Sequence, residues 1–329
     1  MHTTGELKVF AGSSGVRFAQ AMCQYLGVKL GRSETIQFSE GNTFVRIGET
    51  VRDKDVYLVQ PIGLSPNDDL VEIMFWMDAF QRAGAGMVTL ILPYFGYAKG
   101  DKKDEPRVSI RARVCAEGIE AAGADRVVCM DLHAPQIQGF FKKPVIHLFA
   151  RPILCEYVKT LQVENLVVVS PDAGFAKDAR RFADYLGCSV AIGDKARYAH
   201  DEKAEVLEII GEVAGKNCLV VDDFTISGGT LVNLARGLKR RGAGRIMACL
   251  SHNVVTGAGV ARLDESPIER VIVTDSLYNP NACGHAKFEV LSVAPLFAEA
   301  VARMHEGEAV SPLYQRVPDR VIQRQLTML

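Results

Sequence analysis

Short apolar runs recur along the chain, with longer and more polar stretches between them. The runs are rich in Val, Ile and Leu and do not alternate with polar residues. This is typical of strands that are covered on both faces of a parallel sheet. We therefore expect β-strands at residues 7–11, 56–60, 87–92, 126–130, 166–170, 189–192, 218–221, 245–250 and 271–274.

The stretches between these runs have the spacing of amphipathic helices, most clearly at residues 70–82 and 231–241. Gly84, Gly123 and Gly242 come after such stretches and indicate left-handed helix ends. Helices that alternate with strands in this way predict a doubly wound α/β fold with mostly parallel sheets.

The pattern stops and restarts near residues 142–152, and a length of 329 residues favours about two domains. We predict two similar doubly wound domains, an N-terminal one at residues 1–148 and a C-terminal one at 149–300. Residues 301–329 form a C-terminal segment. Its part after Ser311 lacks an apolar face, so we expect partial disorder there.

Charge and composition exclude several classes of protein. The formal net charge is -1, from 38 Lys and Arg residues against 39 Asp and Glu residues, so no basic field would attract nucleic acid or an anionic membrane. No apolar run approaches the roughly 20 residues of a membrane helix, and we expect no signal peptide. The 8 cysteines show no metal or redox spacing. We therefore predict a cytoplasmic protein.

Acidic residues follow several of the expected strands, at the edge of the sheet where doubly wound proteins bind ligands. They are Asp131, Asp172, Asp222, Asp223 and Asp275.

Residues 222–230 are the most informative segment, because two consecutive carboxylates lead into a Gly-Gly-Thr turn and a helix. The glycines let backbone N–H groups approach an anion, and the hydroxyls of Thr225, Ser227 and Thr230 can grip a phosphate. The carboxylates suit a ribose diol, directly or through a magnesium ion. No Lys follows the glycines, so this is not a Walker loop, and the alternative is a plain turn with Thr230 as a helix N-cap.

This segment resembles the 5-phosphoribosyl-diphosphate-binding motif of type I phosphoribosyltransferases and of ribose-phosphate pyrophosphokinases, and further stretches favour the second family. They are residues 93–98 with 101–104, similar to its flexible catalytic loop, residues 131–141, similar to its signature, and residues 38–41, 170–172 and 194–197. The resemblance covers about residues 6–310.

The resemblance implies two domains of the type I phosphoribosyltransferase kind, with ATP bound by the first and ribose 5-phosphate by the second. It also implies a ribose-phosphate diphosphokinase, which transfers the β,γ-diphosphoryl group of ATP to the anomeric hydroxyl of ribose 5-phosphate. The products are 5-phosphoribosyl 1-diphosphate, for nucleotide biosynthesis, and AMP. The implied cofactor is Mg2+, and the implied assembly is a homo-oligomer, either a dimer or a hexamer.

The resemblance further implies roles for single residues. The implied catalytic cations are Lys195, Arg197 and Lys102. The implied ATP-binding residues are Phe38, Glu40, Asn42, Lys99, Gly100, Asp101 and His133, with Phe38 stacked on adenine. The implied ribose-phosphate-binding residues are Asp222, Asp223, Thr225, Ile226, Ser227, Gly228, Gly229 and Thr230. The implied ligands of Mg2+ are Asp131, His133 and Asp172.

Four departures from the family pattern bear on rate and regulation. They are Lys99-Gly100 in place of Arg-Gln, Asn42 in place of Glu, Ile226 in place of Asp, and Lys142 and Ile146 in place of acids. A second hypothesis is therefore a catalytically weak regulatory or associated subunit of the same family, although the chemical residues named above are all present. A third is a phosphoribosyltransferase that consumes the diphosphate, which would explain residues 222–230 and not the signature at 131–141.

Overall fold

The computed structural model of the chain describes residues 5–196 and 206–326. They form two compact units. The N-terminal unit contains the chain up to Phe149 and the chain from Ser292 onward, and the C-terminal unit is Ala150–Leu291.

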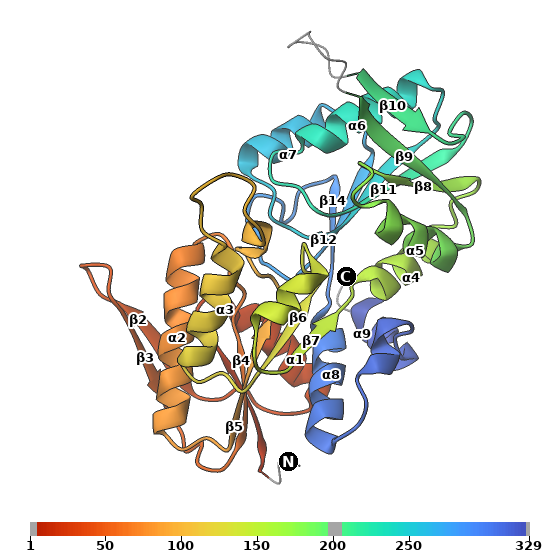
Figure 1. The fold of residues 1–329 in the computed structure, drawn as a ribbon. Helices are drawn as coiled ribbons and strands as arrows, with labels where there is room; N and C mark the ends of the chain where they lie inside the picture. The colour runs from red at the N-terminus through yellow and green to blue at the C-terminus, as the bar shows by residue number, and fades with distance from the viewer. Residues whose placement is uncertain (1–4, 197–205, 327–329) are drawn as a thin grey trace. The chain divides into compact units, whose positions relative to one another are not determined.

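The N-terminal unit is built on a parallel sheet in the order β1-β4-β5-β6-β7. Its strands are β1 (Leu7–Ala11), β4 (Asp55–Val59), β5 (Met87–Leu92), β6 (Arg126–Met130) and β7 (Val145–Leu148). Its helices are α1 (Val16–Leu26), α2 (Pro66–Arg82), α3 (Arg111–Ala121), α8 (Ala294–Glu306) and α9 (Asp319–Leu326), with short 3₁₀ helices η1 (Ala98–Gly100), η2 (Pro135–Phe140) and η3 (Ser311–Tyr314). Helices α2 and α3 cover one face of the sheet, and α1 and α8 cover the other (Figure 1).

An antiparallel hairpin extends from this unit, formed by β2 (Ser33–Gln37) and β3 (Thr43–Ile47). Figure 1 shows its turn at the left edge of the view, beyond α2. Val45 and Ile47 pack against the core of the unit, whereas Ile36 and Phe44 are exposed. The hairpin thus has one side fixed on the unit and an apolar side in solvent.

Aromatic packing fills the space between the sheet and α2. Trp76 and Phe80 are fully buried and stacked, with ring centroids 5.5 Å apart, and Phe80 lies 5.1 Å from the ring of Phe10 in β1. Every residue of β4 is buried. A strand that is covered on both faces has no polar side to present, which explains the apolar run that follows its first residue, Asp55.

The C-terminal unit is built on a larger sheet in the order β10-β9-β8-β11-β12-β13-β14, in which β10 runs antiparallel to β9 and the other pairs are parallel. Its strands are β8 (Leu166–Ser170), β9 (Ser189–Ala196), β10 (Val206–Ile210), β11 (Asn217–Phe224), β12 (Ile246–His252), β13 (Arg270–Thr274) and β14 (Phe288–Leu291). Its helices are α4 (Arg151–Thr160), α5 (Ala176–Leu186), α6 (Gly229–Arg240) and α7 (Gly257–Asp264). Helices α6 and α7 contribute side chains to one hydrophobic core on this sheet.

The doubly wound α/β fold with mostly parallel sheets is confirmed. Gly84, Gly123 and Gly242 have φ angles of 76°, 121° and 81°, as their places after helices predict. The sequence pattern did not predict β2, β3, β7, β10 or β14. Strand β11 is longer than expected because its pairing with β12 continues as far as Phe224, so both aspartates belong to the strand. Among the described helices, none is long and apolar enough to cross a membrane.

The chain returns to the N-terminal unit after β14. Helix α8 packs on α1, where the rings of Phe18 and Phe297 meet edge to face with centroids 5.3 Å apart. Residues 311–326, for which we expected partial disorder, form η3 and α9, and Leu313, Val317 and Val321 are buried.

A buried carboxylate connects α1, α8 and α9. Glu299 has no exposed surface and accepts hydrogen bonds from Tyr25 Oη at 2.8 Å and from Arg303 Nε at 2.8 Å. Arg320 Nη2 lies 2.6 Å from Glu299 Oε2, the oxygen that accepts from Tyr25. Burial alone would raise the pKa of Glu299, but the hydrogen bonds from Arg320, Tyr25 and Arg303 outweigh it and lower this pKa.

Candidate active site

The C-terminal end of β11 presents two neighbouring carboxylates. The strand lies between β8 and β12, and its last residues include the half-buried Asp222 and Asp223. The N–H of Asp223 donates to Asp222 Oδ1 at 2.9 Å, and the N–H of Phe224 donates to Asp223 Oδ1 at 2.8 Å. These backbone hydrogen bonds fix both side chains at the edge of the sheet where ligands bind.

A third carboxylate comes from the neighbouring strand β8. Asp172 follows this strand, and its loop is fixed by Ser170 Oγ donating to Asp172 O at 2.7 Å and by the N–H of Phe175 donating to Asp172 Oδ1 at 3.1 Å. Burial, then the charge of Asp223 and more weakly that of Asp172, raise the pKa of Asp222 to about 8. The structure therefore brings Asp172, Asp222 and Asp223 into one anionic cluster.

Asp222→Asn is expected to flatten the pH dependence of stability in the ligand-free protein. Because the folded-state pKa of Asp222 lies above its usual 3.8, the stability that it contributes is present below about pH 4 and is lost as the pH rises toward 8. The variant should therefore be more stable than the wild type at pH 8, by about 1–3 kcal/mol. Urea unfolding from pH 4 to pH 8, without metal or substrates, measures this difference, and the exposed Asp184→Asn is the control. If the stability of Asp222→Asn and of the wild type changed with pH in the same way, the pKa of Asp222 would not be raised in the folded protein.

The loop between β11 and α6 has the form of an anion site. Gly228 has a φ of 70°, a conformation that favours glycine, and a Cβ there would make a tight contact of 3.1 Å with Leu263 Cγ. Its N–H donates to Thr225 Oγ1 at 3.1 Å, and the N–H of Gly229 makes a long 3.4 Å contact with Ser227 Oγ. The hydroxyls of Thr225 and Ser227 and the N–H groups of Gly228 and Gly229 therefore lie together at the start of α6, where we predict a phosphate.

Helix α7 and its N-cap residue hold this loop through hydrogen bonds, and the sequence did not predict these contacts. The N–H of Thr256 donates to Ile226 O at 2.9 Å, and Arg262 Nη1 donates to Ser227 O at 2.7 Å. The side chain of Ile226 is 45% exposed. Thr256 could have been recognised as the N-cap of α7, whereas nothing in the sequence places Arg262 at the loop.

Strand β9 carries the predicted catalytic cations. Ser170 pairs with Ile192, so Lys195 lies three residues beyond that pair, in the part of β9 that pairs with β10. The structure describes the backbone of Lys195 and not its side chain. Arg197 lies outside the described residues.

In the N-terminal unit, Asp131 and His133 follow β6. Asp131 has a φ of 38°, which is rare for a residue other than glycine, and its N–H donates to Leu148 O at 3.1 Å. The N–H of Leu132 donates to His147 Nε2 at 2.9 Å. This turn leaves His133 exposed at the carboxyl end of the strand. Strained backbone of this kind is often found at functional sites.

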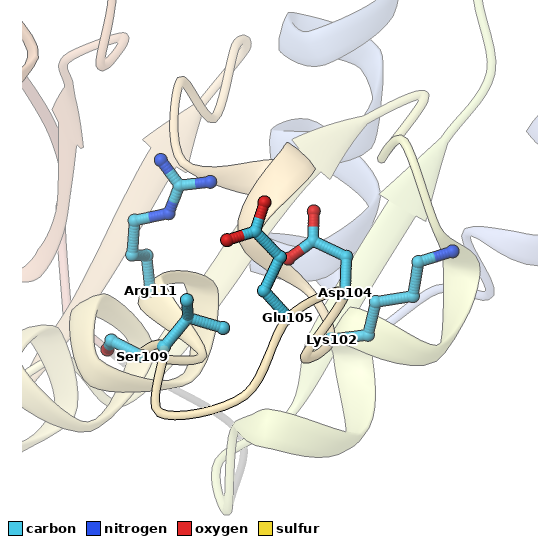
Figure 2. Close-up of a pocket in the computed structure, with 6 residues that line it drawn as sticks. Lys102, Asp104, Glu105, Ser109 and Arg111 are labelled. Atoms are coloured by element: carbon cyan, nitrogen blue, oxygen red, sulfur yellow. The ribbon is translucent and has the colours of Figure 1, made fainter.

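The loop between η1 and α3 lines a pocket of about 370 Å³, together with the first residue of α3 (Figure 2). Gly100 is buried in η1, Lys99 is exposed, and Asp101 and Lys102 come next. The residues that line the pocket are Lys102, Asp104, Glu105, Val108, Ser109 and Arg111. Of the predicted site residues, the pocket thus contains Lys102, and it adds Arg111, which was not among the predicted site residues.

The three residues predicted to contact adenine and its ribose lie at the turn of the β2–β3 hairpin. Phe38 is 44% exposed, and Glu40 and Asn42 are exposed. The N–H of Phe38 donates to Asn42 O at 2.8 Å, and the rings of Phe38 and Phe44 have centroids 6.3 Å apart. These three residues do not line the pocket that contains Lys102.

The acidic cluster is compatible with a magnesium site. The described part of the chain contains no group of three or more His, Cys, Asp or Glu side chains placed to hold a metal ion. Mg2+, however, keeps several waters and takes one or two protein carboxylates together with substrate phosphates. Burial and the charge of Asp223 raise the pKa of Asp222, and a cation beside this carboxylate would stabilise its charged form, so Asp222 fits such an ion.

Comparisons with known proteins agree with this geometry. Residues 7–123 match the family model of the N-terminal domain of ribose phosphate pyrophosphokinase, and residues 196–315 match that of the phosphoribosyl synthetase-associated domain. The ribose-phosphate pyrophosphokinase of Caldanaerobacter subterraneus subsp. tengcongensis is 46% identical over 94% of this chain and 98% of its own length. That of Rhizobium meliloti is 44% identical over 94% of this chain and 100% of its own. The crystal structure of phosphoribosylpyrophosphate synthetase from Mycobacterium smegmatis has a TM-score of 0.86 at 34% identity, with 92% and 99% of the two chains covered.

Proposed function

Because the chain belongs to the ribose-phosphate pyrophosphokinase family, we propose that it transfers the β,γ-diphosphoryl group of ATP to the anomeric hydroxyl of ribose 5-phosphate. The observation that carries this proposal is the end of β11, where two carboxylates lead into the left-handed Gly228 and the N-terminus of α6. Such an arrangement offers acceptors for a ribose diol and donors for its 5-phosphate.

Ribose 5-phosphate is bound by the C-terminal unit in this proposal. Asp222 and Asp223 accept from the sugar hydroxyls or contact its metal. The hydroxyls of Thr225, Ser227 and Thr230, with the backbone N–H groups of Gly228 and Gly229, bind the 5-phosphate, and the backbone at Ile226 completes the loop. Because the 3.4 Å contact between Gly229 and Ser227 is weak, a phosphate can replace it at little cost.

ATP is bound by the N-terminal unit. Lys99, Gly100, Asp101 and Lys102 belong to the loop that contacts its phosphates. Phe38 stacks on adenine, with Glu40 and Asn42 beside it, and the 44% exposure of Phe38 leaves a face of its ring open for stacking.

Phosphoryl transfer of this kind depends on positioning and on neutralising charge. The anomeric oxygen attacks the β-phosphorus, the bond from that phosphorus to the oxygen of the α-phosphate breaks, and AMP leaves. Lys195 and Arg197 stabilise negative charge on the transferred group. Asp131, His133 and Asp172 are the residues that would hold Mg2+, which neutralises polyphosphate charge when it is bound.

Release of AMP from ATP, measured with and without ribose 5-phosphate in the presence of magnesium, tests the reaction. We expect AMP only when the sugar phosphate is present, in equal amounts with 5-phosphoribosyl 1-diphosphate. AMP without the sugar phosphate would indicate hydrolysis. No AMP at high protein concentration would contradict the proposal and favour a regulatory subunit.

We also propose that the chain works as a homo-oligomer, a dimer or a hexamer, in the cytoplasm. The exposed apolar side of the β2–β3 hairpin, which includes Ile36 and Phe44, supports an assembly because such surface is more stable when covered. The partners in this proposal are ATP and ribose 5-phosphate, and we expect no nucleic-acid or membrane partner.

A further inference from the structure

Gly100 and Arg111 share one space in the N-terminal unit. Gly100 is the buried last residue of η1, and Arg111 is the first residue of α3. A Cβ on Gly100 would lie 2.8 Å from both Cβ and Nε of Arg111. The stem of Arg111 therefore lies where any side chain at position 100 would begin.

Arg111 is placed for a ligand and not for a structural ion pair. It is exposed, lines the 370 Å³ pocket with Lys102, and makes no ion pair with any residue that the structure describes. Arg113, two residues further along α3, contrasts with it, because Arg113 Nε lies 2.9 Å from Glu117 Oε1 one helical turn away.

The charges around the pocket indicate what it would bind. Figure 2 shows the guanidinium of Arg111 and the carboxylates of Asp104 and Glu105 pointing to the same side of the loop. A lone phosphate would be repelled by these two acids. A polyphosphate that carries its magnesium offers anionic oxygens to Arg111 and Lys102 and a cation to the acids.

We propose that Arg111 binds the triphosphate of magnesium-bound ATP, and that Gly100 is required because it leaves room for this side chain. A guanidinium can contact phosphate oxygens through two parallel hydrogen bonds, which an ammonium group cannot do. The inference rests on the proposed function for the identity of the nucleotide.

Substitution of Arg111 tests the first part. We expect Arg111→Ala to raise the KM for ATP and the Kd of magnesium-bound ATP measured without sugar by about 10–100-fold. The KM for ribose 5-phosphate should stay within about twofold, and Arg111→Lys should restore part of the loss. The matched control is Arg113→Ala, which removes an exposed arginine of the same helix and should bind ATP like the wild type. Unchanged ATP binding by a folded Arg111→Ala protein would overturn the proposal.

A double-mutant cycle tests the second part. As a single substitution, Gly100→Gln should weaken ATP binding by displacing Arg111. In a protein that already has Arg111→Ala, it should weaken ATP binding little further. Additive effects would show that residue 100 acts independently of Arg111. Thermal unfolding of all four proteins reports whether the substitutions disturb the fold.

Two further measurements separate the possible failures. If the wild type forms no AMP in the presence of ribose 5-phosphate, the proposed function fails, whereas the ATP titrations still decide the role of Arg111. Titration with inorganic phosphate is the second measurement, and we expect Arg111→Ala to leave this weaker binding unchanged. An equal loss of phosphate and ATP binding would assign the pocket to a free anion and overturn the nucleotide assignment.

Discussion

Replacing Lys195 with alanine is expected to lower kcat by about 10²–10³-fold while the protein stays folded. The residue belongs to β9, three positions beyond the pair between Ser170 and Ile192, so its backbone lies past the carboxyl end of β8, the strand that leads to Asp172. A cation there would act on charge that develops in the transition state. The loss should therefore be in kcat, with a smaller change in the KM of either substrate.

Initial rates of AMP formation at saturating substrates measure this effect, with circular dichroism as a check of folding. Lys216→Ala is a suitable control. Lys216 precedes β11 at the opposite end of the sheet, and its Nζ is 3.4 Å from Ser189 Oγ. Lys195→Arg keeps the charge with a different shape and should recover activity only in part. Near-normal turnover of Lys195→Ala would remove the residue from the mechanism.

The second large effect concerns stability. The double substitution Arg303→Ala, Arg320→Ala is expected to lower the free energy of unfolding at pH 7 by about 3–5 kcal/mol. It leaves the fully buried Glu299 with Tyr25 as its only hydrogen-bond donor among the described residues. In the wild type the two cations help to lower the pKa of Glu299, and without them burial would raise it. The loss of stability in the double variant should therefore shrink as the pH falls through the usual titration range of a glutamate.

A third substitution separates buried charge from lost packing. Adding Glu299→Leu to the double variant should recover a large part of the stability, because an apolar side chain of similar size needs no cation. The exposed Arg316→Ala, in the same C-terminal segment, should change the free energy of unfolding by less than about 0.5 kcal/mol. Urea unfolding at pH 7 and pH 4 provides all the values. If the triple variant is less stable than the double variant, uncompensated charge is not the cause.

The strands of both sheets that are covered on two faces could be predicted, because complete burial leaves an uninterrupted apolar run. The hairpin could not, because its two strands have five residues each and are largely exposed, so neither presents a clear alternation. Strand β10 was missed for a different reason, since Val206–Ile210 is an edge strand that pairs only with β9 among the described strands. Short edges carry little pattern to detect.

The parts of the candidate site that are contiguous in the sequence could be predicted from it. The acids, glycines and hydroxyls of residues 222–230 lie on one strand end and one helix start, so their proximity follows from local geometry. Arg262 reaches the same loop from a helix about 35 residues later, and no pattern encodes that contact. The contact between Gly100 and Arg111 likewise depends on how η1 meets α3, which is a property of packing and not of spacing.

The return of the chain to its first unit has a consequence for synthesis on the ribosome. The segment up to Phe149 emerges without α8, so the face of its sheet that carries α1 is only partly covered, and Phe18 lacks its partner Phe297. At about 5–20 residues per second, this open state lasts on the order of 10–30 s, until α8 has been made. Ala150–Leu291 is complete before then. The half of the protein that is translated second can therefore finish folding first, and the half that is translated first closes last.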